Sequence, residues 1–211
     1  MTSAASSADA RLLELELLDP RMVHLVRLFR HAGGDWNPPD EKYRNLRVDP
    51  PDGHKAEYAV LYTGSTLPAV AMECRVLRAD DQDHYTWDAE LASQYKVVRY
   101  DYLSPALFVP IDGRNRQLLG LSGAQRKFKG YAPYQEVALA LFRRFGNLAH
   151  GLSWESFHRG QPGRVYAIWH HQKTAIALKA TKPLPYGSLD EDDGWQEFLA
   201  EYPDIERMDV K

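Results

Sequence analysis

The sequence of 211 residues has few features that could cross-link the chain or anchor it in a membrane. Its single cysteine, Cys74, excludes an intramolecular disulfide and any zinc site built on two or four cysteines. The apolar runs, such as residues 56–61 interrupted by Glu57, are far too short to cross a bilayer. The first ten residues lack the basic start and apolar core of a signal peptide, so we expect a cytoplasmic protein without membrane contact.

The net charge and the absence of several signature motifs exclude further classes of function. The 26 Lys and Arg residues against 29 Asp and Glu give a net charge of −3, so we expect no direct binding to nucleic acid. The sequence has no Gly-x-Gly-x-x-Gly, phosphate-loop, Gly-x-Ser-x-Gly or His-Glu-x-x-His motif. His170 and His171 are adjacent and would point to opposite faces of a strand, so we expect no metal site.

The remaining composition, 44% hydrophobic and 26% charged, is typical of a globular protein. Helices and short strands mix along the chain, which indicates an α/β (α+β) class. We expect residues 1–8 to be disordered and residues 9–211 to form one domain. The expected helices are 9–19, 67–73 capped by Ser65 or Thr66, 134–145 and an acidic 191–202, and the expected strands are 58–62, 96–103, 152–156, 165–170 and 174–180. Residues 23–29 fit a helix or a first strand, and 32–55 are turn-rich and irregular.

A few polar side chains stand in apolar surroundings. Glu73 has mostly apolar neighbours in its expected helix and either faces solvent beside Arg75 or serves a function. Arg27 and Arg47 also interrupt apolar sequence, which predicts either a structural ion pair or an anionic ligand. Tyr62, at the end of a strand, closes the core or stacks on a flat ligand. Ser156 alone is an ordinary strand or turn hydroxyl.

The order of these residues resembles the RES domain family, which is named for its Arg, Glu and Ser residues. The matching pieces are VRL around Arg27, NLRVDPP around Arg47, AVLYTGSTLPAVAME ending at Glu73, and GLSWESFHRG with Ser156. The resemblance covers about residues 22–170. The family often has Gly-Gly-Arg-Trp-Asn-Pro around its named arginine, whereas residues 33–38 here read Gly-Gly-Asp-Trp-Asn-Pro. We therefore place that arginine at Arg47, with Arg30 as the alternative.

The resemblance implies an ADP-ribosyltransferase-like fold, with small mixed sheets around an NAD cleft and flanking helices. It also implies a toxin that is paired with an Xre-type helix-turn-helix antitoxin and that consumes NAD⁺ by hydrolysis or phosphorolysis. NAD is then a substrate, and no metal is required. Two alternatives stay open. One is a protein ADP-ribosyltransferase, and the other is a non-catalytic interaction protein, which the altered residue Asp35 favours.

The resemblance also assigns roles. Glu73, Arg47 and Ser156 are the expected catalytic residues, and Arg27, Tyr62, Arg47 and Arg30 are expected to bind NAD⁺. Arginines bind a pyrophosphate through paired hydrogen bonds, and a tyrosine ring stacks on the nicotinamide cation. The carboxylate of Glu73 stabilises the positive charge that develops on the ribose, and Ser156 orients the nicotinamide amide or a ribose hydroxyl.

Overall fold

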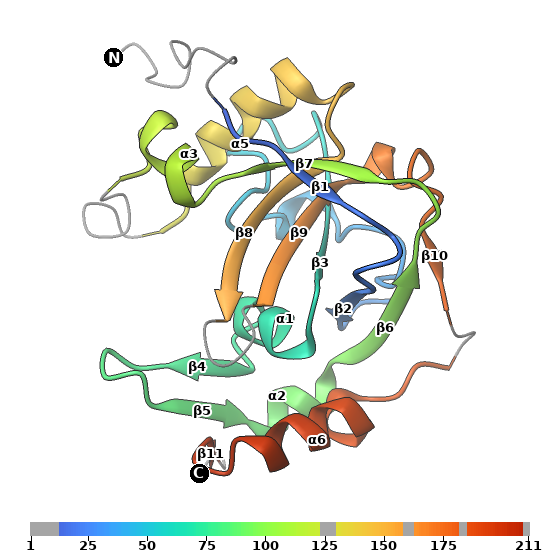
Figure 1. Ribbon diagram of the computed structural model, residues 1–211, viewed down its shortest axis with the longest axis vertical. Coiled ribbons are helices and arrows are strands. Elements are labelled where there is room, and N and C mark those ends of the chain that lie inside the picture. Colours follow the sequence, from blue (N-terminus) through green and yellow to red (C-terminus); the bar gives the residue numbers. More distant parts are fainter. Residues whose placement is uncertain (1–12, 123–129, 158–162, 182–184, 209–211) are drawn as a thin grey trace.

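The computed structural model describes residues 13–122, 130–157, 163–181 and 185–208. Its main feature is a curled eight-stranded sheet with the strand order β1-β7-β8-β9-β3-β2-β6-β10 (Figure 1). Neighbouring strands are antiparallel except β7 and β8, which are parallel. The strands are β1 (Glu16–Leu18), β2 (Leu25–Phe29), β3 (Val60–Gly64), β6 (Lys96–Asp101), β7 (Ala106–Pro110), β8 (Gly151–Phe157), β9 (Gly163–Trp169) and β10 (Lys179–Ala180).

A smaller sheet with the order β11-β5-β4 completes the β structure. Helix α1 lies between the two sheets, and α2 and α6 lie beside the smaller one (Figure 1). The smaller sheet consists of β4 (Leu77–Ala79), β5 (Tyr85–Asp88) and β11 (Glu206–Met208). The α-helices are α1 (Leu67–Glu73), α2 (Ala89–Gln94), α3 (Gly113–Leu118), α5 (Ala132–Phe145) and α6 (Asp193–Glu201), and short 3-10 turns lie at Glu41–Tyr43, His170–Gln172 and Leu189–Glu191. This arrangement confirms the expected α+β class.

Hydrophobic packing fixes these layers. On one face of the larger sheet, Val137 and Leu141 of α5 belong to the same buried cluster as Leu152 of β8 and Val165 of β9. The opposite face buries strand residues such as Phe108. A third cluster joins α1, α6 and the smaller sheet. Burying apolar side chains in this way is the main favourable contribution to folding.

The unit formed by β3 and α1 folds as the sequence predicts. Thr66 caps α1 by accepting a hydrogen bond from the Ala69 N–H at 3.4 Å, and Pro68 occupies the first turn. At Gly64, an added Cβ would lie only 2.7 Å from Val70, so the close approach of strand and helix requires glycine. The unit places Glu73 at the carboxyl end of α1, directed toward β8.

Two expected elements are wrong. Residues 13–18 form an extended segment that ends in β1, not a helix. Leu17 pairs with Leu107 and stays exposed, while the neighbouring Glu16 points inward to a charged cluster, an alternation that belongs to an edge strand. Residues 174–177 form a turn, with only 179–180 in a strand, and Ala177 adopts φ +51°.

The other expected elements are confirmed with shifts of a few residues at their ends. The ambiguous residues 23–29 contain β2, and the irregular character of 32–55 holds apart from one 3-10 turn. The expected disorder of residues 1–8 lies outside the described residues.

Candidate functional site

A cavity of about 430 Å³ opens between β2, β3, α1 and the irregular segment that contains Arg47. Such concave spaces with a few convergent polar groups are where ligands bind. Five of the six predicted site residues line it: Arg27, Arg30, Arg47, Tyr62 and Glu73. The sixth, Ser156, lies behind Glu73 and contacts it directly.

Glu73 is held by two donors from β8. Its Oε1 accepts a hydrogen bond from the indole Nε1 of Trp154 at 2.9 Å and one from Ser156 Oγ at 3.0 Å. The carboxylate is only 16% exposed, so it does not face open solvent beside Arg75. At this depth the hydrogen-bond donors and a neighbouring cation take the place of the water that would otherwise solvate the carboxylate.

That cation is Arg47. Its Nη2 lies 3.7 Å from Glu73 Oε1, which is a loose ion pair. The guanidinium also lies over three aromatic rings, 5.7 Å from the centroid of Tyr131, 5.5 Å from Tyr134 and 5.4 Å from Trp154. Its Nε is buried and has no hydrogen-bond partner among the described residues. Arg47 is therefore held mainly by ring faces and keeps unused donor capacity.

The sequence model of the RES domain family matches residues 24–190. This chain belongs to the RES domain family. The expected resemblance is confirmed, and the matched region ends about twenty residues further along the chain than expected. The structure is also similar to a chain of the M. tuberculosis MbcT–MbcA toxin–antitoxin complex, with a TM-score of 0.52 and 14% identity over 95% of this chain and 98% of that chain. That likeness shows a shared fold. No curated protein matches the sequence significantly.

The loop that carries Arg47 in this RES domain is clamped on both sides of it. Asp49 accepts a hydrogen bond from the Leu46 N–H at 2.7 Å. The Tyr62 hydroxyl accepts from the Val48 N–H and donates to Asp49 Oδ1, each at 3.2 Å. Burial raises the pKa of Asp49 and holds the pKa of Tyr62 well above its usual value. Sequence reasoning missed Asp49, although a carboxylate directly before two prolines suggests a loop-fixing role.

Tyr62 thus uses its hydroxyl to hold the loop and presents its ring to the cavity. The ring also meets the Trp154 ring edge-on, with centroids 6.2 Å apart. This geometry leaves ring stacking on a ligand possible and removes the hydroxyl from such a contact.

The other two predicted arginines occupy different positions. Arg27 on β2 is 6% exposed and donates to the carbonyl oxygens of Gly34 at 2.8 Å and Tyr62 at 3.0 Å. Burial lowers the pKa of Arg27. Arg30 is exposed, donates to Gln94 and lies 4.9 Å from the ring centroid of Tyr95. Arg27 therefore braces the cavity wall, and Arg30 stands at its edge.

The Gly-Gly-Asp-Trp-Asn-Pro string packs elsewhere. Asp35 accepts a hydrogen bond from the Tyr186 hydroxyl at 3.2 Å and is not among the described residues that line the cavity. Lys173 lies 3.8 Å from the Trp36 ring centroid and donates to the Trp36 carbonyl at 2.5 Å. Burial, with a smaller contribution from Arg27, lowers the pKa of Lys173 to about 8. Asp35 therefore takes part in a packing contact away from the Arg47–Glu73 pair.

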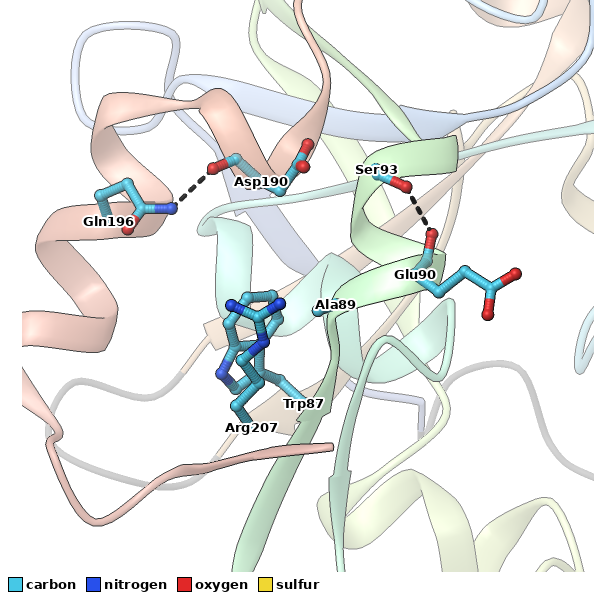
Figure 2. Close-up of a pocket in the computed structure, with 7 residues that line it drawn as sticks. All are labelled: Trp87, Ala89, Glu90, Ser93, Asp190, Gln196 and Arg207. Carbon is cyan, nitrogen blue, oxygen red and sulfur yellow. Dashed lines mark hydrogen bonds between the residues drawn. The ribbon is translucent and has the colours of Figure 1, made fainter. Parts of the chain in front are cut away.

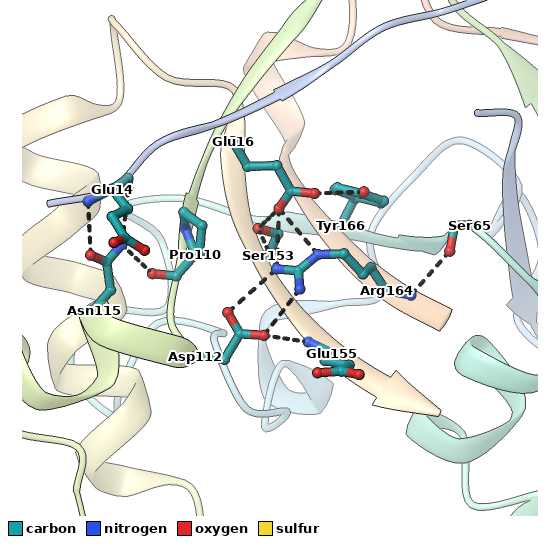
Figure 3. Close-up of polar contacts among 10 residues, drawn as sticks. All are labelled: Glu14, Glu16, Ser65, Pro110, Asp112, Asn115, Ser153, Glu155, Arg164 and Tyr166. Carbon is teal, nitrogen blue, oxygen red and sulfur yellow. Dashed lines mark hydrogen bonds and ion pairs between the residues drawn. The ribbon is translucent and has the colours of Figure 1, made fainter. Parts of the chain in front are cut away.

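A second charged cluster lies beside β8, where Arg47 and Arg164 line a common hollow. Arg164 of β9 contacts Glu16 Oε2 and both carboxylate oxygens of Asp112, and Glu16 accepts from Ser153 and Tyr166 (Figure 3). Its one guanidinium is paired with two carboxylates, as in a structural ion-pair network.

A separate hollow of about 560 Å³ lies between α2, β5, α6 and β11. Arg207 stacks over the ring of Trp87 there, and Gln196 donates to the Asp190 carbonyl (Figure 2). It contains none of the predicted site residues. The cavity beside Glu73 is therefore the candidate active site.

Metal and membrane features are not found in the described part of the chain. No group of three or more His, Cys, Asp or Glu side chains there is placed to hold a metal ion. His171 contacts the Gly146 carbonyl, whereas His170 contacts Lys173. No described helix has the length and apolar character needed to span a bilayer.

Proposed function

We propose that this RES domain protein is a toxin that consumes cytoplasmic NAD⁺ by breaking the bond between nicotinamide and ribose. One observation carries the proposal: Glu73 and Arg47 face the same cavity, each with hydrogen-bonding capacity that no described side chain uses. An anionic dinucleotide whose reaction generates positive charge needs one group of each sign. The family membership supports this use of the cavity.

The chemistry follows from the positions of the groups. The C1′–N bond breaks heterolytically, its electron pair returns to the nicotinamide nitrogen, and the ribose gains oxocarbenium character. The fixed carboxylate of Glu73 stabilises that charge more in the transition state than in bound NAD⁺. Water or phosphate then adds to C1′; a water molecule loses its proton to solvent. Arg47 binds the pyrophosphate, and the Tyr62 ring packs against nicotinamide.

We assign the remaining predicted residues supporting roles rather than direct chemical ones. The single hydroxyl hydrogen of Ser156 is within reach of Glu73 and of the Ala69 carbonyl, so in this proposal it acts on the carboxylate rather than as a nucleophile. Arg27 is committed to two backbone carbonyls and supports the cavity wall. In this proposal the exposed Arg30 leaves its contact with Gln94 to meet the more distant part of the dinucleotide.

The similar fold in a toxin–antitoxin complex supports a protein partner for this chain. In our proposal this partner is an Xre-type helix-turn-helix antitoxin that covers the cavity. A neighbouring gene that encodes a helix-turn-helix protein would supply this partner, and co-expression with its product is expected to give a complex with suppressed NAD⁺ turnover. A stable complex with unchanged turnover would contradict a covering partner.

The deciding experiment measures NAD⁺ loss and product mass, with and without phosphate. Glu73→Gln is expected to lower kcat by about 100- to 1,000-fold, because the stabilising charge is removed while the volume is kept. The matched control is Glu136→Gln, an exposed helical glutamate on α5. Release of ADP-ribose would identify water as the acceptor, and release of its 1″-phosphate would identify phosphate. Labelling of a protein with no free product would support ADP-ribosyl transfer, and no reaction in any condition would favour the non-catalytic alternative.

A further inference from the structure

Two donors converge on a single oxygen of Glu73. Trp154 Nε1 and Ser156 Oγ both reach Oε1, and Arg47 Nη2 approaches the same atom. Within the described residues, Oε2 accepts no hydrogen bond. Oε1 is thus held by the protein, whereas Oε2 remains available to a ligand in the cavity that Glu73 lines.

The two donors are not equivalent. A serine hydroxyl carries one hydrogen, and Ser156 Oγ lies within reach of both Glu73 and the Ala69 carbonyl, at 3.0 and 3.1 Å. The indole N–H of Trp154 donates to Glu73 alone. Trp154 is 2% exposed, so water does not compete for that hydrogen bond.

The backbone of β8 fixes this arrangement. Trp154 and Ser156 are two residues apart and so point to the same face, toward α1. The pairing of β8 with β9 shifts between Glu155 and Phe157, and Ser156 lies at this irregularity. Bulges of this kind re-aim side chains beside active sites. Trp154, in contrast, pairs regularly with Val165 and is held rigidly.

Trp154 also contacts the other two members of the site. The Arg47 guanidinium lies 5.4 Å from its ring centroid, and the Tyr62 ring meets it at 6.2 Å. One indole therefore bonds the carboxylate, supports the guanidinium and packs against the aromatic wall.

We propose that Trp154 is the positioning residue of the site: its N–H fixes Glu73 Oε1, and its ring supports Arg47, so that Oε2 faces the substrate. The inference rests on the proposed function for its catalytic consequence, while the hydrogen bond itself exists in the free protein. Both parts can be tested separately.

The first test observes the indole N–H signals of the ¹⁵N-labelled free protein by NMR. Trp154→Phe identifies the Trp154 signal by its disappearance, and Glu73→Gln is expected to move that signal upfield because a charged acceptor becomes neutral. Trp169 and Trp195, whose buried indole nitrogens have no partner in the described structure, are internal references that should not move. A Trp154 signal unchanged by Glu73→Gln overturns the inference, whatever the activity. If Trp154→Phe does not fold, triple-resonance assignment of the wild-type protein identifies the Trp154 signal instead, and the Glu73→Gln protein retains Trp154.

The second test compares two matched tryptophan variants. Trp154→Phe keeps a ring under Arg47 and loses the donor, so kcat for NAD⁺ is expected to fall about 10- to 100-fold with KM changed less than about threefold. Trp87→Phe is the control, since Trp87 is also buried under an arginine but lies in the hollow of Figure 2. Equal kcat for wild type and Trp154→Phe overturns the inference. Absence of NAD⁺ turnover in the wild type defeats the proposed function and leaves the NMR test to decide the contact.

Discussion

Two arginines beside β8 differ sharply in how their charge is compensated. Arg164 and Arg47 are both about three-quarters buried, with side chains 26% and 22% exposed. Arg164 has two carboxylate partners, Glu16 at 3.1 Å and Asp112 at 3.2 Å. Arg47 has one carboxylate at 3.7 Å, three ring faces and a buried Nε without a described partner.

This difference suits Arg164 to a role in stability and Arg47 to a role in ligand binding. The Arg164 cluster joins β1, the loop before α3, and strands β8 and β9, so its ion pairs hold segments that are far apart in sequence (Figure 3). Around Arg47, the protein supplies aromatic surface and a fixed loop and leaves donors unused. A site that must bind an anion is expected to retain such capacity at some cost in stability.

Among the arginine substitutions, the largest expected effect is on activity, from Arg47→Lys. Lysine keeps the charge and loses the planar fork that binds phosphates through two parallel hydrogen bonds. We expect kcat/KM for NAD⁺ to fall about 100-fold. The melting temperature should change by less than about 2 °C, because Arg47 contributes few saturated contacts. Steady-state kinetics and thermal unfolding of the same preparation measure kcat/KM and the melting temperature. A large fall in the melting temperature would show that Arg47, like Arg164, serves mainly stability.

The opposite result is expected from Arg164→Met. Removal of the cation leaves Glu16 and Asp112 close together without compensation. Fully buried pairs cost about 3–5 kcal/mol when broken, and the partial exposure here reduces that to about 2 kcal/mol. The melting temperature is then expected to fall by about 4–8 °C. Well below that temperature, NAD⁺ turnover should stay within about threefold of wild type, and Arg164→Lys should recover part of the lost stability.

Sequence reasoning predicts the β3–α1 unit well because its signals are local. A β-branched and aromatic run, a small-residue turn, Thr66 as cap and Pro68 in the first turn lie within fifteen residues and agree with one another. These signals also place Glu73 at the end of a helix. The order of the motif residues then identifies the family.

The parts that sequence reasoning misses depend on distant partners. The segment before Pro20 is extended because it pairs with β7 and buries Glu16 beside Arg164, a residue 148 positions away. Likewise, Trp154 and Glu73 are 81 residues apart, so nothing local indicates that the indole bonds the carboxylate. Local propensity cannot reveal such contacts, since tertiary pairing overrides it.

The smallest effect is expected where ion-pair geometry is best. Arg143 donates to both carboxylate oxygens of Glu57, at 2.6 and 3.0 Å, but its side chain is 53% exposed. These bonds and that from His54 lower the pKa of Glu57 to about 2. A depressed carboxyl pKa contributes stability above its unfolded value of 4.5, and this contribution disappears as the pH falls toward 2. Because exposed pairs are screened by water and salt, Arg143→Met should shift the melting temperature by no more than about 1 °C at pH 7. Any such shift should vanish as the pH falls from 4.5 toward 2. A shift as large as that of Arg164→Met would mean that ion-pair geometry, rather than burial, determines how much these arginines contribute to stability.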